Sequence, residues 1–315
     1  QHQRFGQAAL LQPQHAHQMQ RRIVPRRGGQ RLSIETLGIT ETELGLGHSQ
    51  SLDHATLLKN LHEIQERNVV PKSRSLIDDG SGYGFPNFSV EMETGTGKTY
   101  VYLRTIFELH RRFGFTKFVI VVPSIAIKEG VYKSLQITED HFKGLYAGAP
   151  FDYFLYDSSR IGQVRNFATS AHIQIMVVTV GAINKKDVNN LYKDSEKTGG
   201  EKPIDLIRAT RPIVIVDEPQ SVDNTPKAQA AIKKLNPLMT LRYSATHRSE
   251  YNLVYRLDPV KAYEKRLVKQ IIVASVGQHL DPIAEGVTPL LGTVDLGLHY
   301  FAFFPLRGFA GRLVS

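Results

Sequence analysis

The stretch Phe88–Thr99, FSVEMETGTGKT, decides the fold class. Phe88–Met92 is apolar at alternate positions and is predicted to be a strand. The last eight residues fit the pattern GxxxxGK[ST], except that Met92 stands where the pattern has its first glycine. Gly95 and Gly97 let the backbone turn tightly, so that successive N–H groups converge on phosphate oxygens at a helix N-terminus. We therefore predict a phosphate-binding loop; the alternative is a chance Gly-Lys-Thr turn.

The side chains of this loop suit a nucleoside triphosphate. Lys98 places a point charge where the β- and γ-phosphates would lie, and the hydroxyl of Thr99 is a ligand for Mg²⁺. A helix is predicted directly behind the loop, over Thr99–Phe113. We therefore predict ATP and Mg²⁺ as cofactors, with the cofactor-binding residues Thr94, Gly95, Thr96, Gly97, Lys98 and Thr99.

A second motif is acidic and follows a buried strand, 119 residues after Lys98. The apolar run Ile213–Val216 leads into Asp217-Glu218-Pro219-Gln220. Ligands of open α/β sheets bind at the carboxyl ends of the strands, where these two carboxylates are expected. One carboxylate can hold Mg²⁺ and the next can activate the attacking water, so we assign the metal to Asp217 and the water to Glu218. A solvated strand end is the alternative.

Between and after these motifs, strands alternate with helices. An amphipathic helix is predicted over 52–67, and the run Phe118–Val122 is typical of a strand buried on both faces. The alternation predicts an α/β fold with a mostly parallel sheet and helices on both faces. Asn184–Pro203 is a polar stretch that predicts a surface insertion or a functional loop. Further strands are predicted over Tyr153–Tyr156, Ile173–Val180, Ile213–Val216 and Leu238–Tyr243.

Three weaker signals also follow strands. Ser244-Ala245-Thr246 is by itself only a small polar turn, Pro123-Ser124 is a helix start with Ser124 as N-cap, and Thr179 is an ordinary strand end. Together with the loop and the Asp-Glu-Pro-Gln box, however, their order resembles motifs I, Ia, II and III of superfamily 2 helicases. More closely, Met92–Leu103, Val121–Ile127 and Arg242–Arg248 resemble the Res subunit of type III restriction–modification enzymes. The resemblance covers roughly residues 50–276.

This resemblance implies a first RecA-like, P-loop NTPase lobe of a DNA-dependent ATPase and translocase. It implies catalytic roles for Glu218, Asp217 and Lys98, metal binding by Thr99 and Asp217, and ATP with Mg²⁺. The residues implied to couple the nucleotide to DNA are Gln220, Ser244, Ala245 and Thr246, and those implied to contact duplex DNA are Pro123, Ser124 and Thr179. The implied partners are double-stranded DNA and the methyltransferase (modification) subunit, and the family acts as an endonuclease.

The resemblance fades at both ends. We expect a basic leader without stable structure over 1–44, the RecA-like domain over 45–276, and an atypical tail over 277–315. Motors of this class need a second RecA-like lobe with an arginine finger, and the restriction subunit carries a nuclease site. Neither is recognised in residues 277–315, so we expect an incomplete motor. Alternatives are a non-enzymatic basic nucleic-acid-binding module and a non-functional gene remnant.

Composition narrows the function classes further. The chain of 315 residues has no cysteine, which excludes a disulfide scaffold, a thiol nucleophile and a cysteine-ligated metal. No apolar run reaches the roughly 18 residues of a membrane helix, and we expect a cytoplasmic protein without a membrane partner. The net charge is +9, but residues 1–34 supply six arginines and no acid. A solvated tail is favoured there over a nucleic-acid-binding arm, so the net charge adds little to the argument for DNA.

Overall fold

The computed structural model describes residues 39–50, 52–77, 82–184, 190–268, 270–274 and 300–304. The described residues form two compact units that meet in sequence after Asp258. Of the leader expected over 1–44, residues 1–38 lie outside the described residues. No helix in the described part of the chain is long and apolar enough to cross a bilayer.

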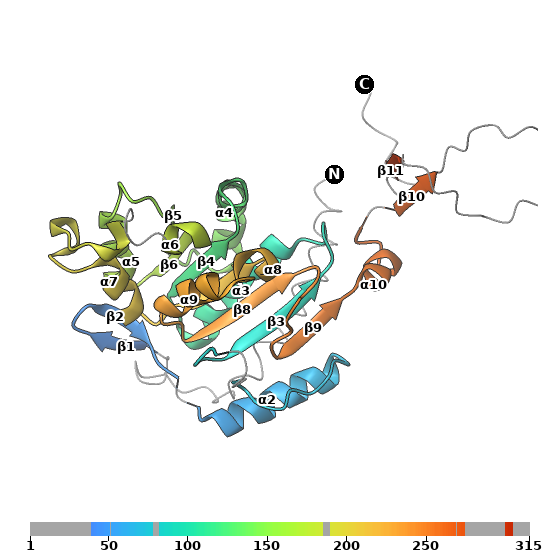
Figure 1. Ribbon diagram of the computed structural model, residues 1–315, viewed down its shortest axis with the longest axis horizontal. Coiled ribbons are helices and arrows are strands. Elements are labelled where there is room, and N and C mark those ends of the chain that lie inside the picture. Colours follow the sequence, from blue (N-terminus) through green and yellow to red (C-terminus); the bar gives the residue numbers. More distant parts are fainter. Residues whose placement is uncertain are drawn as a thin grey trace, which may run out of the picture. The chain divides into compact units, whose positions relative to one another are not determined.

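A seven-stranded sheet forms the centre of the first unit (Figure 1). Its strands run in the order β5-β6-β4-β7-β8-β3-β9, and every neighbouring pair is parallel. The predicted α/β class and the parallel sheet are confirmed. The strands are β3 (Asn87–Met92), β4 (Lys117–Val122), β5 (Phe151–Leu155), β6 (Ile173–Thr179), β7 (Ile213–Asp217), β8 (Met239–Ser244) and β9 (Leu253–Leu257).

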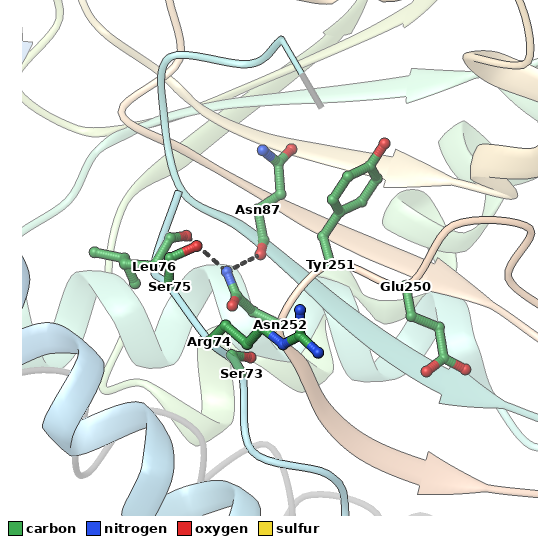
Figure 2. A pocket seen from close by; sticks show the side chains of 8 residues that line it. All are labelled: Ser73, Arg74, Ser75, Leu76, Asn87, Glu250, Tyr251 and Asn252. Carbon is green, nitrogen blue, oxygen red and sulfur yellow. Dashed lines mark hydrogen bonds between the residues drawn. The ribbon is translucent and has the colours of Figure 1, made fainter. Parts of the chain in front are cut away.

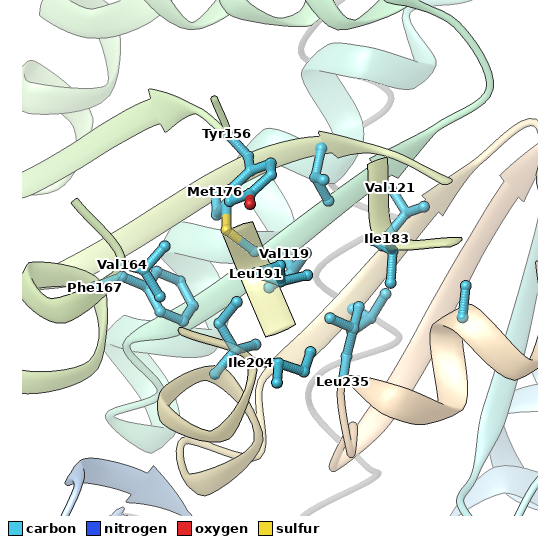
Figure 3. Packing of buried hydrophobic residues seen from close by; sticks show 14 of the residues in the cluster. Val119, Val121, Tyr156, Val164, Phe167, Met176, Ile183, Leu191, Ile204 and Leu235 are labelled. Atoms are coloured by element: carbon cyan, nitrogen blue, oxygen red, sulfur yellow. The ribbon is translucent and has the colours of Figure 1, made fainter. Parts of the chain in front are cut away.

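Strands β4, β6 and β7 are buried almost throughout, as their continuous β-branched runs predict. Their side chains alternate between the two faces of the sheet. One face forms the cluster in Figure 3, in which Val119 and Met176 pack with Phe167, Ile204 and Leu235. The helices over this face are α5 (Gly162–Thr169), α6 (Val180–Asn184), α7 (Pro203–Ala209) and α9 (Pro226–Lys234).

Two longer helices pack on the strands from the other face. They are α3 (Lys98–Phe113) and α4 (Ile125–Leu145), and their residues are absent from the cluster of Figure 3. The ring of Phe107 joins them, because it stacks on Phe142 at 4.6 Å and meets Phe151 of β5 edge to face at 4.9 Å. Helix α3 therefore starts at the phosphate-binding loop and is anchored in the core along its length.

Helix α2 (His54–Arg67) is the predicted amphipathic helix, and it covers the edge strand β9. Strand β9 is not among the predicted strands. The amide nitrogen of Gln65 donates to the Leu253 carbonyl at 3.0 Å, and that of Asn68 donates to the Val254 carbonyl at 2.6 Å. These two polar side chains satisfy backbone oxygens of an edge strand, which would otherwise face solvent.

A hairpin of β1 (Ile39–Thr42) and β2 (Gly45–His48) precedes α2, so regular structure begins ahead of the expected boundary at residue 45. The hairpin is pinned to the start of β4 by His48. The Nε2 atom of this imidazole accepts hydrogen bonds from the backbone N–H groups of Thr116 at 2.9 Å and Lys117 at 3.1 Å.

Within the polar stretch Asn184–Pro203, residues 190–203 include two short 3₁₀ helices, η3 (Asn190–Tyr192) and η4 (Glu196–Thr198). Leu191 is buried in the core cluster, so this part of the predicted insertion covers the sheet. Residues 185–189 lie outside the described residues. The second unit contains α10 (Pro259–Glu264) and an antiparallel pair of β10 (Gln270–Ala274) and β11 (Tyr300–Phe304).

Candidate functional site

The predicted phosphate-binding loop lies between β3 and α3, in the strand–loop–helix order that the sequence indicates. Gly95 and Gly97 have φ values of 79° and 91°, a region that side-chain-bearing residues rarely adopt. A Cβ atom built on Gly95 would meet no atom within 4 Å, so the space above the loop is open. The buried Thr96 hydroxyl donates to the Glu93 carbonyl at 2.6 Å and braces the turn, while Thr94 is exposed.

Lys98 and Glu218 meet at the carboxyl edge of the sheet, although 120 residues separate them in sequence. The Lys98 ammonium donates to Glu218 Oε1 at 2.5 Å. Burial alone would raise the pKa of Glu218, but hydrogen bonds from Lys98, Gln220 and Ser244 outweigh burial and leave that pKa lowered. The carboxylate is therefore held in its charged form.

Asp217 lies beside this pair and is almost fully buried at the end of β7. The hydroxyl of Tyr102 donates to Asp217 Oδ2 at 3.3 Å and is also hydrogen-bonded to the side chain of Thr99. Burial, and then the adjacent Glu218 carboxylate, raise the pKa of Asp217 to about 6. A cation stabilises a buried carboxylate of this kind. Tyr102 links this carboxylate to the hydroxyl of Thr99 through hydrogen bonds.

The short helix α8 (Pro219–Val222) begins directly after Glu218. Glu218 is its N-cap in the left-handed conformation, with φ of 54°, which is strained for a residue with a side chain. Its Oε2 atom accepts from Gln220 at 2.6 Å and lies 3.0 Å from the Ser244 hydroxyl, which is also 2.7 Å from Gln220 Oε1. Ser244 is further linked to Thr246, whose N–H donates to it at 3.2 Å, across Ala245.

The residues implied to contact DNA lie at the same edge of the sheet. Strand β4 ends immediately before Pro123, and its last residue, Val122, is paired with Thr179 of β6. Ser124 is exposed and caps α4 by accepting the Ile127 N–H at 3.3 Å, as predicted. The Thr179 hydroxyl accepts the Ala182 N–H at 3.3 Å. Ser124 and Thr179 therefore lie at the carboxyl ends of two paired strands, β4 and β6.

Sequence reasoning missed several residues around this site. Tyr102 is fully buried and reads as an ordinary helix residue in the sequence. Arg242 lies in β8, where a charged residue inside an apolar strand is the signal that would have found it. Gln65 and Asn68, at the end of α2, are hydrogen-bonded to β9.

A hollow of about 260 Å³ lies elsewhere, near the amino ends of β3 and β9 (Figure 2). Asn252 crosses its floor and donates from its amide to the Leu76 and Asn87 carbonyls, each at 2.8 Å. Because the phosphate-binding loop follows the carboxyl end of β3, this hollow is not part of the nucleotide site.

Comparison with known proteins gives matches over the same region. Residues 55–249 match the family model for the type III restriction enzyme, res subunit. The chain is 32% identical over 231 residues to the EcoPI Res subunit of Escherichia phage P1, and 35% identical over 231 residues to the EcoP15I Res subunit of Escherichia coli. These alignments cover 68% and 67% of this chain but only 23% of either relative.

Structural comparison gives more distant matches. The UvsW helicase from bacteriophage T4 matches at 14% identity and a TM-score of 0.34, over 70% of this chain and 62% of that one. The Type ISP restriction–modification enzyme LlaGI matches at 14% identity and a TM-score of 0.39, over 57% of this chain and 18% of that one. Such distant matches carry no functional argument, whereas the family match spans more than half of the chain. The chain therefore belongs to the type III restriction enzyme Res subunit family, of which it carries the helicase-like ATPase domain.

Proposed function

We propose that the chain is the ATP-binding lobe of a DNA-dependent ATPase and translocase of a type III restriction endonuclease. The observation that carries the proposal is the meeting of Lys98, Asp217 and Glu218 at one edge of the sheet, beneath an open glycine loop. Phosphoryl transfer to water uses a cation on the phosphates, a carboxylate for the metal and a carboxylate that activates water. Lys98, Asp217 and Glu218 supply these three groups.

The residues present fit a nucleotide with Mg²⁺. Backbone N–H groups of Thr94–Thr99 would hold the phosphates, and the Thr99 hydroxyl with the Asp217 carboxylate would hold the metal. Mg²⁺ at nucleotide sites takes few protein ligands and fills its shell with phosphate and water oxygens. When bound, Mg²⁺ supplies charge neutralisation on the phosphates.

Glu218 is the proposed general base. Its ionised carboxylate is free to accept a proton from water once Lys98 turns from Glu218 toward phosphate. Gln220 and Ser244 orient the other carboxylate oxygen and connect it to Ala245 and Thr246, the proposed coupling segment. A change at the nucleotide would thereby be transmitted to the segment that follows β8.

Duplex DNA is the proposed partner at the same edge of the sheet, along Pro123, Ser124 and Thr179. Small hydroxyls and helix starts contact phosphates without reading sequence, which suits movement along any DNA. Since the chain spans 23% of the length of the relatives it matches, nuclease activity, a second RecA-like lobe with its arginine finger and the modification subunit are proposed for the full assembly. We propose a cytoplasmic location for this assembly.

Hydrolysis of radiolabelled ATP tests the proposal. With protein in excess and Mg²⁺ present, we expect slow phosphate release, because the arginine finger of a second lobe, which contributes roughly 10³–10⁵ in rate, is not supplied. Duplex DNA should accelerate this release. Glu218→Gln keeps the shape of the side chain and removes the base, and should abolish release while ATP still binds. Equal rates for wild type and Glu218→Gln would refute the proposed role of Glu218.

A further inference from the structure

We propose that Arg242 is a positioning residue, which clamps the far end of helix α8 through Asp223 and so holds Glu218 at its place beside Lys98. The inference deepens the proposed function and rests on the role given there to Glu218. It starts from a charged side chain that the nucleotide site does not touch. Arg242 lies on β8 inside the sheet and is only 1% exposed, although its side chain is charged.

The guanidinium of Arg242 is fixed on every side. Its Nε and Nη2 atoms donate to the Asn87 side-chain oxygen at 3.1 and 3.0 Å, and its Nη1 atom donates to Asp223. The rings of Tyr83 and Tyr251, which meet edge to face at 6.0 Å, lie 5.0 and 4.8 Å from it as two cation–π contacts. A buried guanidinium in which each of the three nitrogens donates a hydrogen bond is held in one orientation.

Asp223 is the C-cap of α8, and its N–H donates to the Pro219 carbonyl at 3.0 Å. It also accepts a hydrogen bond from the Tyr83 hydroxyl at 2.8 Å. Tyr83 lies just before β3, so the aspartate is tied both to β8 and to the segment that leads into the phosphate-binding loop. Both contacts of the carboxylate end on residues that are themselves buried.

Strand β8 therefore holds helix α8 at both ends. Ser244 contacts the carboxylate of Glu218 at the start of the helix, and Arg242 contacts that of Asp223 at its end. Glu218 needs this support because its left-handed backbone is strained. A cavity of about 130 Å³ adjoins the clamp, lined in part by Gln220 and His247, and leaves room for α8 to shift when the clamp is released.

The clamp also gives β8 a mechanical role. The strand continues directly into Ser244-Ala245-Thr246, and His247 behind it lies 3.3 Å from the Val90 carbonyl of β3, through its Nε2 atom. A displacement of the segment after β8 is thus transmitted to α8 at two points. With both points fixed, Glu218 moves as one body with the strand.

The first experiment measures the mobility of α8. Because the chain has no cysteine, a nitroxide on the exposed Ser221→Cys labels this helix alone. We expect Arg242→Lys and Asp223→Ala to broaden the range of label motion in the electron paramagnetic resonance spectrum, and Asp223→Asn, which retains an acceptor for Arg242, to restore most of the wild-type spectrum. Lys233→Ala is the matched control, since the exposed Lys233 also lies over the Tyr83 ring, at 5.2 Å, but does not contact Asp223.

The second experiment separates positioning from a general structural role. In unlabelled protein, Arg242→Lys and Asp223→Ala should lower single-turnover ATP hydrolysis about tenfold or more, since small misplacements of a catalytic group are costly. The dissociation constant for Mg·ATP should stay within about twofold, because the loop residues that bind it are unchanged. Asp223→Asn should recover most of the rate.

Unchanged label mobility in both clamp variants would overturn the proposal. So would increased mobility with a wild-type rate, or a loss of ATP affinity that parallels the loss of rate. A wild-type chain that neither binds nor hydrolyses ATP would instead refute the proposed function, and the mobility measurement would still decide whether the clamp exists.

Discussion

Replacing His48 by glutamine tests how the hairpin β1–β2 is joined to the sheet. The imidazole is buried, and its Nε2 atom accepts two backbone N–H groups at the start of β4. Burial, and then the charge of Lys117, lower the pKa of His48 to about 3. The side-chain oxygen of glutamine can accept the same two N–H groups but cannot take up a proton.

The size of the effect follows from proton linkage. The ordinary pKa of histidine is about 6.5, so below that pH the unfolded chain binds a proton that the folded protein excludes. The stability due to His48 is therefore complete above about pH 6.5 and is lost as the pH falls toward 3. Between pH 8 and pH 5 the loss amounts to about 2 kcal/mol. Burial also lowers the pKa of Lys117, to about 8, but its titration lies mostly above this range.

Urea unfolding at several pH values between 5 and 8 measures this quantity. The free energy of unfolding of wild type should fall by about 2 kcal/mol more than that of His48→Gln over this range. Other groups titrate alike in the two proteins and cancel in the difference. Parallel pH profiles for the two proteins would show that His48 is accessible to protons and that the hairpin is not anchored in this way.

Three further predictions concern the core, the leader and the DNA edge. Phe107→Ala should lower the free energy of unfolding by about 3–5 kcal/mol, whereas Ile137→Ala, at a side chain 71% exposed on α4, should change it by less than about 0.5 kcal/mol; equal effects in urea unfolding would contradict the packing described. Deleting residues 1–34 removes six arginines and should weaken the salt dependence of DNA binding without abolishing affinity; complete loss in a fluorescence titration would favour the non-enzymatic basic module instead. Ser124→Ala should cost about 1 kcal/mol as a lost N-cap and should also weaken DNA binding; a loss of stability with unchanged DNA affinity would limit Ser124 to capping.

The parts of the fold that the sequence predicts best are those with unmixed local signals. Val119 and Val214 lie in continuous β-branched runs, which predict strands buried on both faces. Gly95 and Gly97 predict a loop that only glycine can form, and the structure shows their positive φ values. The meeting of Lys98 with Glu218 follows from topology, because carboxyl ends of parallel strands share one edge.

The elements that were missed depend on partners distant in sequence. Strand β9 contains Arg256 and is only partly buried, so its pattern does not stand out; it forms because β3 pairs with it and α2 covers it. The charge of Arg242 predicts an exposed side chain, but Asn87 and Asp223 accept hydrogen bonds from its guanidinium and allow its burial. The hairpin before α2 depends on His48, whose hydrogen-bond donors are backbone N–H groups at the start of β4.

The loop from Thr94 to Thr99 is proposed to bind the phosphates of ATP. Calorimetric titration of Mg·ATP into wild type and Lys98→Ala tests it most directly, with Lys233→Ala as a variant that removes a lysine elsewhere. We predict saturable one-site binding to wild type and Lys233→Ala, and binding at least about tenfold weaker to Lys98→Ala, since a charge-assisted contact is worth roughly 1.5–3 kcal/mol. Equal affinities for wild type and Lys98→Ala would contradict the account.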